Sequence, residues 1–387
     1  MAAPMIAAVV PLFTAAALAI PGSDRTRRRV DAVGTWLTLA AALVMPWWTL
    51  PFLGTDRFSA FAAIAVAAAA VAPGVAEIDT FGRIARQIVL AGMLLAALGG
   101  HPAIMNAGLA LAVAAGLAPR LPLVWYRVPL TGSALGLVLF GAILPPSHLT
   151  SGCAVLGLAA LAVAVPALLP LVPLLALRFA GPELIAVGGT GLAVCAVLSA
   201  KTVMLREGGP PTTSSRSAPQ GVGGPPSRTM TGKEGAGPRT NWLALGHTAA
   251  IALAFGLRSP EAVFAGLILT LLAVFGQSAV ELAKGQGVSA TVAAAARAGL
   301  PPFGVFPGLA LLVLAVGRQS PWVLAVVLPS LAAMGWSAIA HLTPPRIVAA
   351  DRWAAAWVPV VLALLVGFCL PDFCAAWLRV SATEVLR

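Results

Sequence analysis

Long apolar runs recur along the whole chain and are separated by short polar segments. Each run of about 18 or more residues is long enough to cross a hydrocarbon core of about 30 Å as a helix. Helices are expected because irregular backbone facing lipid would leave amide groups unpaired. The pattern therefore predicts an all-α, polytopic transmembrane helix bundle of about 13 segments, near residues 5–21, 30–52, 57–73, 85–100, 102–118, 128–146, 151–177, 182–200, 243–257, 260–280, 288–317, 321–342 and 353–371.

One polar segment divides this pattern. Residues 205–241 are rich in Gly, Pro, Ser and Thr and contain almost nothing that a core could bury. Such a composition is typical of a flexible linker. We therefore expect an N-terminal transmembrane block (1–204), the linker (205–241) and a C-terminal transmembrane block (242–387).

Composition supports a membrane protein and excludes a soluble one. The chain is 59% hydrophobic and 10% charged, with a mean hydropathy of +0.95, whereas soluble domains carry roughly 25% charged residues. The net charge of +11 comes from short clusters between apolar runs, such as Arg27 to Arg29. Because no basic face with interleaved aromatic residues exists, we attribute these clusters to membrane topology and not to nucleic-acid binding.

The charge pattern also predicts an orientation. The apolar stretch from Met1 to Ile20 is followed, not preceded, by its basic cluster, which favours a retained first helix with its N-terminus outside and Arg27 to Arg29 inside. The side of the linker stays open. It falls outside if 151–177, which holds Pro166, Pro170 and Pro173, is one helix, and inside if that stretch is two half-length pieces.

Few residues could carry chemistry. The polar residues inside predicted helices are Asn106, His247, Gln277 and His341. A histidine suits proton relay, although a lone one is more often a neutral, hydrogen-bonded residue, and Gln277 is more often an interhelical hydrogen-bond partner. The scattered cysteines suit packing more than metal binding, and no paired carboxylates, activated nucleophile or phosphate loop appears, with Cys153, Cys195, Cys369 and Cys374 the four cysteines.

The most informative local sequence is AGLPPFGVF, residues 298–306, in the middle of a long apolar run. Pro301 and Pro302 remove amide donors, and Gly299 and Gly304 flank them, so the helix must be interrupted there. Broken helices at mid-membrane depth are tolerated against protein or a wet cavity, and transporters place ion sites at them. A simple proline kink is the alternative.

This motif resembles the broken-helix sequence of the antiporter-like membrane subunits that respiratory complex I, hydrogenase-4-type and formate hydrogenlyase complexes and cation/proton antiporters share, most closely hydrogenase-4 component F. The resemblance continues upstream in GHTAAIALAFGL (246–257) and FAGLILTLLAVFGQSA (264–279). A weaker match covers GGHPAIMNAGLALA (99–112) and VWYRVPLTGSALGLVLFGAIL (124–144). The resemblance implies that family's helix bundle with inverted repeats.

The chain departs from the family at the positions that matter for proton transfer. Family members carry charged residues at mid-membrane, and here the matching positions are apolar or uncharged. The histidine at 247 is retained. The positions that have lost the family's charges are Ala110, Gly246, Leu269, Ala273, Gln277 and Leu309. A proton path needs titratable groups within hydrogen-bonded or water-bridged reach, so the sequence predicts that this chain does not pump by the family's mechanism.

These departures lead to one main hypothesis and two alternatives. The main hypothesis is a mainly structural membrane subunit of a hydrogenase-4-like or complex I-like oxidoreductase in a bacterial inner membrane, packed against other membrane subunits and binding no cofactor itself. The first alternative is a subunit that still translocates protons or another cation through His247, Gln277, His341 and the broken helix. The second is an unrelated membrane enzyme or small-molecule transporter.

Overall fold

The computed structural model describes most of the chain, and every structural statement below concerns these residues: 2–48, 56–71, 79–99, 102–117, 127–144, 148–164, 171–177, 183–207, 239–283, 287–301, 304–340 and 353–386. Within them the chain forms sixteen helices and no strand. The predicted all-α class is therefore confirmed. The middle of the predicted linker, residues 208–238, lies outside the described residues, as do Pro166 and Pro170.

Nine helices precede the linker in the part of the chain that the structure describes. They are α1 (Ala2–Ala19), α2 (Asp24–Trp48), α3 (Arg57–Val71), α4 (Thr80–Leu98), α5 (Pro102–Leu117), α7 (Arg127–Ile143), α8 (His148–Ala164), α9 (Val172–Ala176) and α10 (Glu183–Glu207). Helix α2 begins six residues before the predicted start at residue 30, so Arg27 to Arg29 lie in its first turns and not in a loop. Pro173 lies at the second position of the short helix α9, where a missing amide hydrogen costs nothing.

After the linker, the described ranges contain seven helices. They are α11 (Arg239–Gly256), α12 (Pro260–Ala283), α13 (Gly287–Ala298), α14 (Phe306–Gln319), α15 (Pro321–Ala340), α16 (Trp353–Phe368) and α17 (Asp372–Val385). The predicted segment 288–317 is divided into α13 and α14 at the double proline, as the motif indicated. Helix α17 was not predicted from the sequence.

Several helices begin at side chains that satisfy their first amide groups. The Asp79 carboxylate accepts a hydrogen bond from the Gly82 amide at 3.0 Å at the start of α4. The Asp56 carboxylate accepts one from the Ser59 amide at 2.8 Å at the start of α3. These N-cap side chains supply hydrogen-bond acceptors for amide groups of the first turn, which have no acceptor within the helix.

Small residues allow neighbouring helices to approach closely. A Cβ on Gly92 of α4 would lie 2.6 Å from the backbone of α5 at Gly108 and Ala112, and a Cβ on Gly188 of α10 would overlap the α11 backbone at Leu253. Membrane helices use such contacts because lipid provides no hydrophobic force that drives helices together. The glycines therefore position α4 against α5 and α10 against α11.

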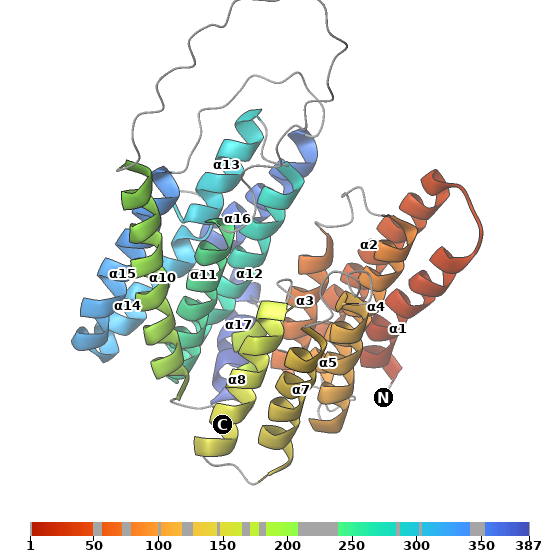
Figure 1. Ribbon diagram of the computed structural model, residues 1–387, viewed down its shortest axis with the longest axis horizontal. Coiled ribbons are helices and arrows are strands. Elements are labelled where there is room, and N and C mark those ends of the chain that lie inside the picture. Colours follow the sequence, from red (N-terminus) through yellow and green to blue (C-terminus); the bar gives the residue numbers. More distant parts are fainter. Residues whose placement is uncertain are drawn as a thin grey trace, which may run out of the picture.

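The helices stand side by side in two groups (Figure 1). Helices α1 to α5 form one group, α10 to α16 form the other, and α7 and α8 lie along the lower edge between them. Helix α10 precedes the linker in sequence but packs on α11 and α15, which follow it. Helix α17 contacts both α3 and α12, so the end of the chain lies where the two groups meet.

Contacts at this junction are both polar and aromatic. The Arg57 guanidinium of α3 lies 3.7 Å from the Glu384 carboxylate of α17. The ring centroids of Phe61 and Trp377 are 6.5 Å apart, and the Arg379 guanidinium lies 5.7 Å from the Phe264 ring centroid in α12. Helix α17 therefore connects the first and second groups of helices.

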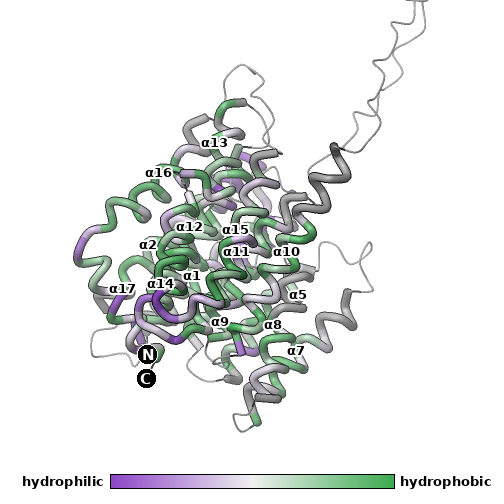
Figure 2. The backbone as a smooth tube through the Cα atoms, turned by 90° about the vertical axis from the view of Figure 1, so that its left-hand side faces the viewer, coloured by the Kyte–Doolittle hydropathy of each residue, from purple (hydrophilic) through white to green (hydrophobic). Residues whose placement is uncertain are grey.

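The helices are apolar over most of their length (Figure 2). Among the described residues, three helices are long and apolar enough to cross a membrane, namely Thr80–Leu98, Pro260–Val280 and Pro321–Ala338. A fourth span results if the pair Trp357–Phe368 and Asp372–Glu384, bent by 76°, counts as one. Further apolar helices of 10 to 17 residues lie among the described residues. The chain is a multi-pass membrane protein, and about 13 segments remains a prediction.

Candidate functional site

The helix break lies between α13 and α14. Helix α13 ends at Ala298 and α14 begins at Phe306. Gly299 has φ +75° and Gly304 has φ +58°, a left-handed backbone that favours glycine. Of the two prolines, Pro301 is described and exposed, whereas Pro302 lies outside the described residues. The predicted broken helix is confirmed.

Backbone hydrogen bonds close the end of α13. The Leu300 amide donates to the Ala295 carbonyl at 3.2 Å, and the Gly299 amide donates to the Ala296 carbonyl at 3.4 Å. This is a Schellman motif, in which the left-handed glycine lets the chain turn back on the last helical carbonyls. The Val305 amide, beyond the break, also donates to the Ala296 carbonyl at 3.0 Å. These bonds let the chain break without exposing carbonyl groups to an apolar environment.

Helix α12 presents three of the predicted positions to this region. Leu269, Ala273 and Gln277 are four residues apart and so lie along one side of the helix. Leu269 is completely buried, Ala273 is buried and Gln277 is half-buried. Gly308 of α14 packs on Leu269, since a Cβ at residue 308 would lie 3.0 Å from the Leu269 Cα.

The other predicted positions near the break are equally apolar. A Cβ on Gly299 would lie 3.0 Å from Cδ1 of Leu309, which places the Leu309 side chain against the break. Gly246 of α11 is covered by the Met334 side chain of α15, which a Cβ at residue 246 would overlap. Leu269 and Gly308 therefore form a closely packed apolar contact between α12 and α14, and Leu309 packs against Gly299 at the break.

Two buried basic groups accompany this apolar contact. His247 of α11 is 4% exposed and Arg297 of α13 is 5% exposed, and the two side chains lie within electrostatic range of each other. The Arg297 backbone packs against α12, where a Cβ on Gly276 would lie 3.3 Å from the Arg297 Cα. Sequence analysis missed Arg297. The available indication was a basic residue two positions before Gly299 in an alanine-rich apolar run.

The structure does not bring all the predicted positions together. Ala110 is exposed on α5, which packs on α4 and α7, and Asn106 is buried on the same helix. His341 lies outside the described residues. Within the described part of the chain, no three His, Cys, Asp or Glu side chains lie close enough to hold a metal ion.

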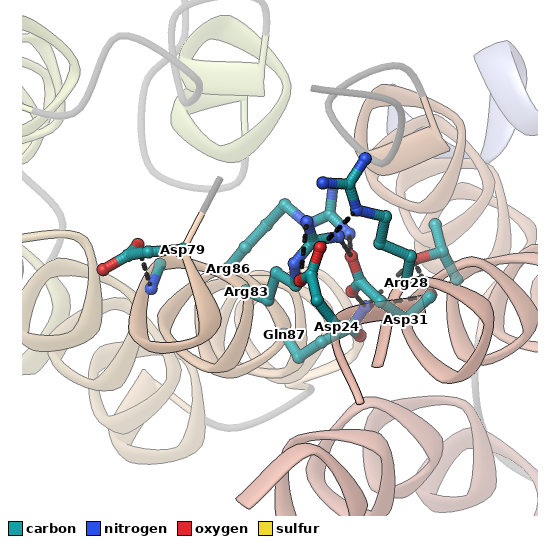
Figure 3. A network of polar contacts seen from close by, with 9 residues as sticks. Asp24, Arg28, Asp31, Asp79, Arg83, Arg86 and Gln87 are labelled. Atoms are coloured by element: carbon teal, nitrogen blue, oxygen red, sulfur yellow. Dashed lines mark hydrogen bonds and ion pairs between the residues drawn. The ribbon is translucent and has the colours of Figure 1, made fainter. Parts of the chain in front are cut away.

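A second polar cluster, which sequence analysis read only as topological charge, joins α2 to α4 (Figure 3). Asp31 and Gln87 are completely buried and Arg83 is 2% exposed. The Gln87 side-chain amide donates to the Asp31 carboxylate at 2.7 Å and to the Thr35 hydroxyl at 2.9 Å. The Arg86 guanidinium also donates to the Asp31 carboxylate. Asp31 is therefore the central acceptor of the cluster.

The arginines around Asp31 have hydrogen-bond donors that are only partly paired. The two closest carboxylate oxygens to Arg83 belong to Asp31, at 3.7 Å, and Asp24, at 3.9 Å. Arg28 donates to Asp24 at 2.8 Å, and Arg27 donates to the Thr80 hydroxyl at 2.8 Å. Buried atoms without a hydrogen-bond partner among the described residues include Arg83 Nε, Arg86 Nη1, Arg27 Nε and Gln87 Oε1. Unsatisfied buried donors are uncommon and call for an explanation.

Comparison with solved structures identifies chains that share the fold of this helix bundle. No protein-family model matches the chain, and no curated protein sequence matches it. A chain of respiratory complex I from Thermus thermophilus has a TM-score of 0.66 at 18% sequence identity, covering 95% of this chain and 99% of that chain.

Two further structures share the fold. A chain of the Mrp complex from Dietzia sp. DQ12-45-1b has a TM-score of 0.70 at 14% identity, covering 100% of this chain and 98% of that chain. A chain of the membrane-bound sulfane sulfur reductase, an archaeal respiratory membrane complex, has a TM-score of 0.65 at 14% identity, covering 100% of this chain and 97% of that chain. The chain therefore shares its fold with chains of these three complexes.

Proposed function

We propose that this protein is a mainly structural, antiporter-like membrane subunit of a hydrogenase-4-like or complex I-like oxidoreductase in a bacterial inner membrane. Its partners would be the other membrane subunits of that complex, with electron transfer carried out by partner subunits. The proposal is supported by the shared fold, because the chains that resemble it come from respiratory complex I and other membrane complexes. Fold alone does not determine function, so the site decides between the alternatives.

The observation that carries the structural role is the apolar contact at the break. Leu269 is 0% exposed, and Gly308 lies directly on it. A proton needs a chain of titratable groups or ordered waters, and a closely packed leucine–glycine contact provides neither. The position that carries a charge in the resembling family thus acts here as a packing position between α12 and α14.

Co-purification tests the subunit role. A tagged protein, solubilised from its own membrane in a mild detergent, should bring down further membrane subunits and a redox-active subunit in fixed ratio. A tagged multi-pass protein of unrelated fold, expressed at the same level, is the control for trapped membrane proteins. Isolation of the chain by itself, at all detergent concentrations that keep it monodisperse, would contradict the proposal.

Proton flux tests the mainly structural role separately. The purified protein, reconstituted into vesicles with an imposed pH gradient, should dissipate that gradient no faster than empty vesicles do. His247→Ala should leave this rate unchanged. Thr270→Ala is the matched control, because Thr270 is also buried in the bundle but its hydroxyl already donates to the Gly266 carbonyl of its own helix at 2.8 Å.

A second function is supported by the buried pair of His247 and Arg297. We infer as the alternative that the chain translocates protons or another cation, using His247, Gln277, His341 and the broken helix. Buried ionisable groups inside membrane segments commonly mark ion pathways. This alternative predicts flux above that of empty vesicles, lost in His247→Ala and retained in Thr270→Ala, which is the opposite of the result expected for a structural subunit.

A further inference from the structure

The shared end of α2 and α4 carries an excess of positive charge in a partly buried setting. Two of its arginines are largely shielded, Arg83 at 2% and Arg86 at 13% side-chain exposure. They share one buried carboxylate, Asp31, which leaves one of their two positive charges without a buried counter-charge. A buried charge is stable only when it is paired and hydrogen-bonded, so this excess requires a counter-charge.

Arg83 shows most clearly that an acceptor is missing. Its closest carboxylate oxygens, at 3.7 and 3.9 Å, are beyond hydrogen-bonding distance. Its Nε atom has no partner among the described residues, and neither does Nη1 of Arg86. The Arg83 side chain therefore lies beside Asp24 and Asp31 of α2 with its Nε donor unused (Figure 3).

Of the two carboxylates, only Asp24 can leave at little cost. Asp31 is completely buried and accepts hydrogen bonds from Arg86 and Gln87. Asp24 has a side chain that is 58% exposed, and its closest partner is Arg28, itself 52% exposed. Such an exposed ion pair contributes little, about 0–1 kcal/mol. Asp24 can therefore turn toward water and leave the outer side of Arg83 open to another anion.

We propose that this end of α2 and α4 binds the phosphate of an anionic phospholipid, with Arg83 and Arg86 as the principal donors. The site lies where α2 passes from its charged first turns into its apolar part, and basic clusters next to a membrane segment attract anionic lipid headgroups. Arginine suits a phosphate because its planar group donates two parallel hydrogen bonds. Gln87 Oε1, an unused acceptor, suits a headgroup hydroxyl, which phosphatidylglycerol supplies.

Lipid titration tests this site. The delipidated full-length protein in dodecyl maltoside is titrated with phosphatidylglycerol, and binding is followed by native mass spectrometry, with phosphatidylcholine and inorganic phosphate as separate arms. We expect phosphatidylglycerol to bind with the highest affinity. Arg83→Gln with Arg86→Gln should weaken its binding by at least about tenfold more than the control pair Arg25→Gln with Arg29→Gln. The control removes the same charge from exposed arginines of α2.

A second variant keeps the test decisive if the double arginine variant does not fold. Asp24→Asn retains both arginines and removes the competing carboxylate, so it should bind phosphatidylglycerol about threefold more tightly. Asp79→Asn is its control, because Asp79 is exposed at the same end of α4 and asparagine still caps a helix.

Three outcomes would overturn the proposal. If phosphatidylcholine binds equally well, the site does not recognise an anionic headgroup. If inorganic phosphate competes at the same concentration as the lipid, the ligand is a free anion. If Asp24→Asn and Asp79→Asn bind phosphatidylglycerol alike, Arg83 is not in contact with the headgroup, and buried water or a partner subunit's carboxylate satisfies it instead. None of these outcomes depends on whether the chain translocates an ion.

Discussion

Gly308 of α14 lies directly on Leu269 of α12, close enough that a Cβ at residue 308 would be 3.0 Å from the Leu269 Cα. This contact brings the broken helix against the longest apolar helix after the linker. The sequence resemblance predicts that residue 269 matches a charged position of the resembling family. The geometry there is that of helix packing and leaves no room for a hydrated side chain.

Leu269→Lys is therefore expected to destabilise the protein by about 2.5–3.5 kcal/mol, the cost of a lysine at the centre of a membrane helix. Leu269→Met, which conserves volume, should cost less than about 1.5 kcal/mol. Thermal unfolding in detergent, followed by the loss of monodisperse protein, measures both. Equal stability of the lysine and methionine variants would mean that residue 269 faces a wet cavity, which would favour ion translocation.

Gly304→Ala tests the backbone of the break. The left-handed φ of +58° and an overlap between the new Cβ and the Ala296 carbonyl should together cost more than about 2 kcal/mol. Gly335→Ala in α15 is the matched control, because nothing lies within 4 Å of a Cβ there, and alanine favours a helix over glycine by up to about 1 kcal/mol. The first variant should melt at a lower temperature than the wild type and the second should not. The same melting temperature for both would show that the break does not depend on a left-handed glycine.

Asp31→Asn should be strongly destabilising. It removes the carboxylate that serves the buried Arg83 and Arg86, and breaking a buried ion pair on one side typically costs about 3–5 kcal/mol. Asp24→Asn, which changes an exposed carboxylate of the same helix, should cost about 0–1 kcal/mol. Denaturant or thermal unfolding in one detergent compares them. A small effect of Asp31→Asn would indicate that the buried arginines find another acceptor.

The junction of α3 with α17 should depend on apolar contact more than on charge. Phe61→Ala removes a ring that is 1% exposed and packs on Trp377, and we expect a loss of about 3–5 kcal/mol. Glu384→Gln breaks the half-exposed ion pair with Arg57 and should cost about 0–1 kcal/mol. Limited proteolysis at the end of α17, combined with thermal unfolding, measures both. If Glu384→Gln released α17 as readily as Phe61→Ala did, the ion pair would be the main attachment.

The sequence predicted those features whose physical cause lies within one segment of the chain. It did not predict features that depend on contacts between helices. The apolar runs predict helices because a segment in lipid must satisfy its own amide groups, and the Gly-Leu-Pro-Pro-Phe-Gly motif predicts the break because proline lacks a donor. Helix α17 escaped prediction because Arg379 and Glu384 interrupt its apolar pattern, and those residues find partners only in α12 and α3. The early start of α2 has a similar cause, since its charged first turns pair with α4.

The sequence alone determined the class of protein and the break at residues 299–304, because hydrophobicity, proline and glycine act on the local backbone. The loss of the family's charged positions stays a prediction from the sequence. Tertiary structure decided which polar residues meet. Arg297 lies within electrostatic range of His247, and Arg83 and Arg86 share Asp31, although 50 residues or more separate the members of each pair in the sequence. The free energy of a buried charge depends on its neighbours across helices, and only the packed bundle determines those neighbours.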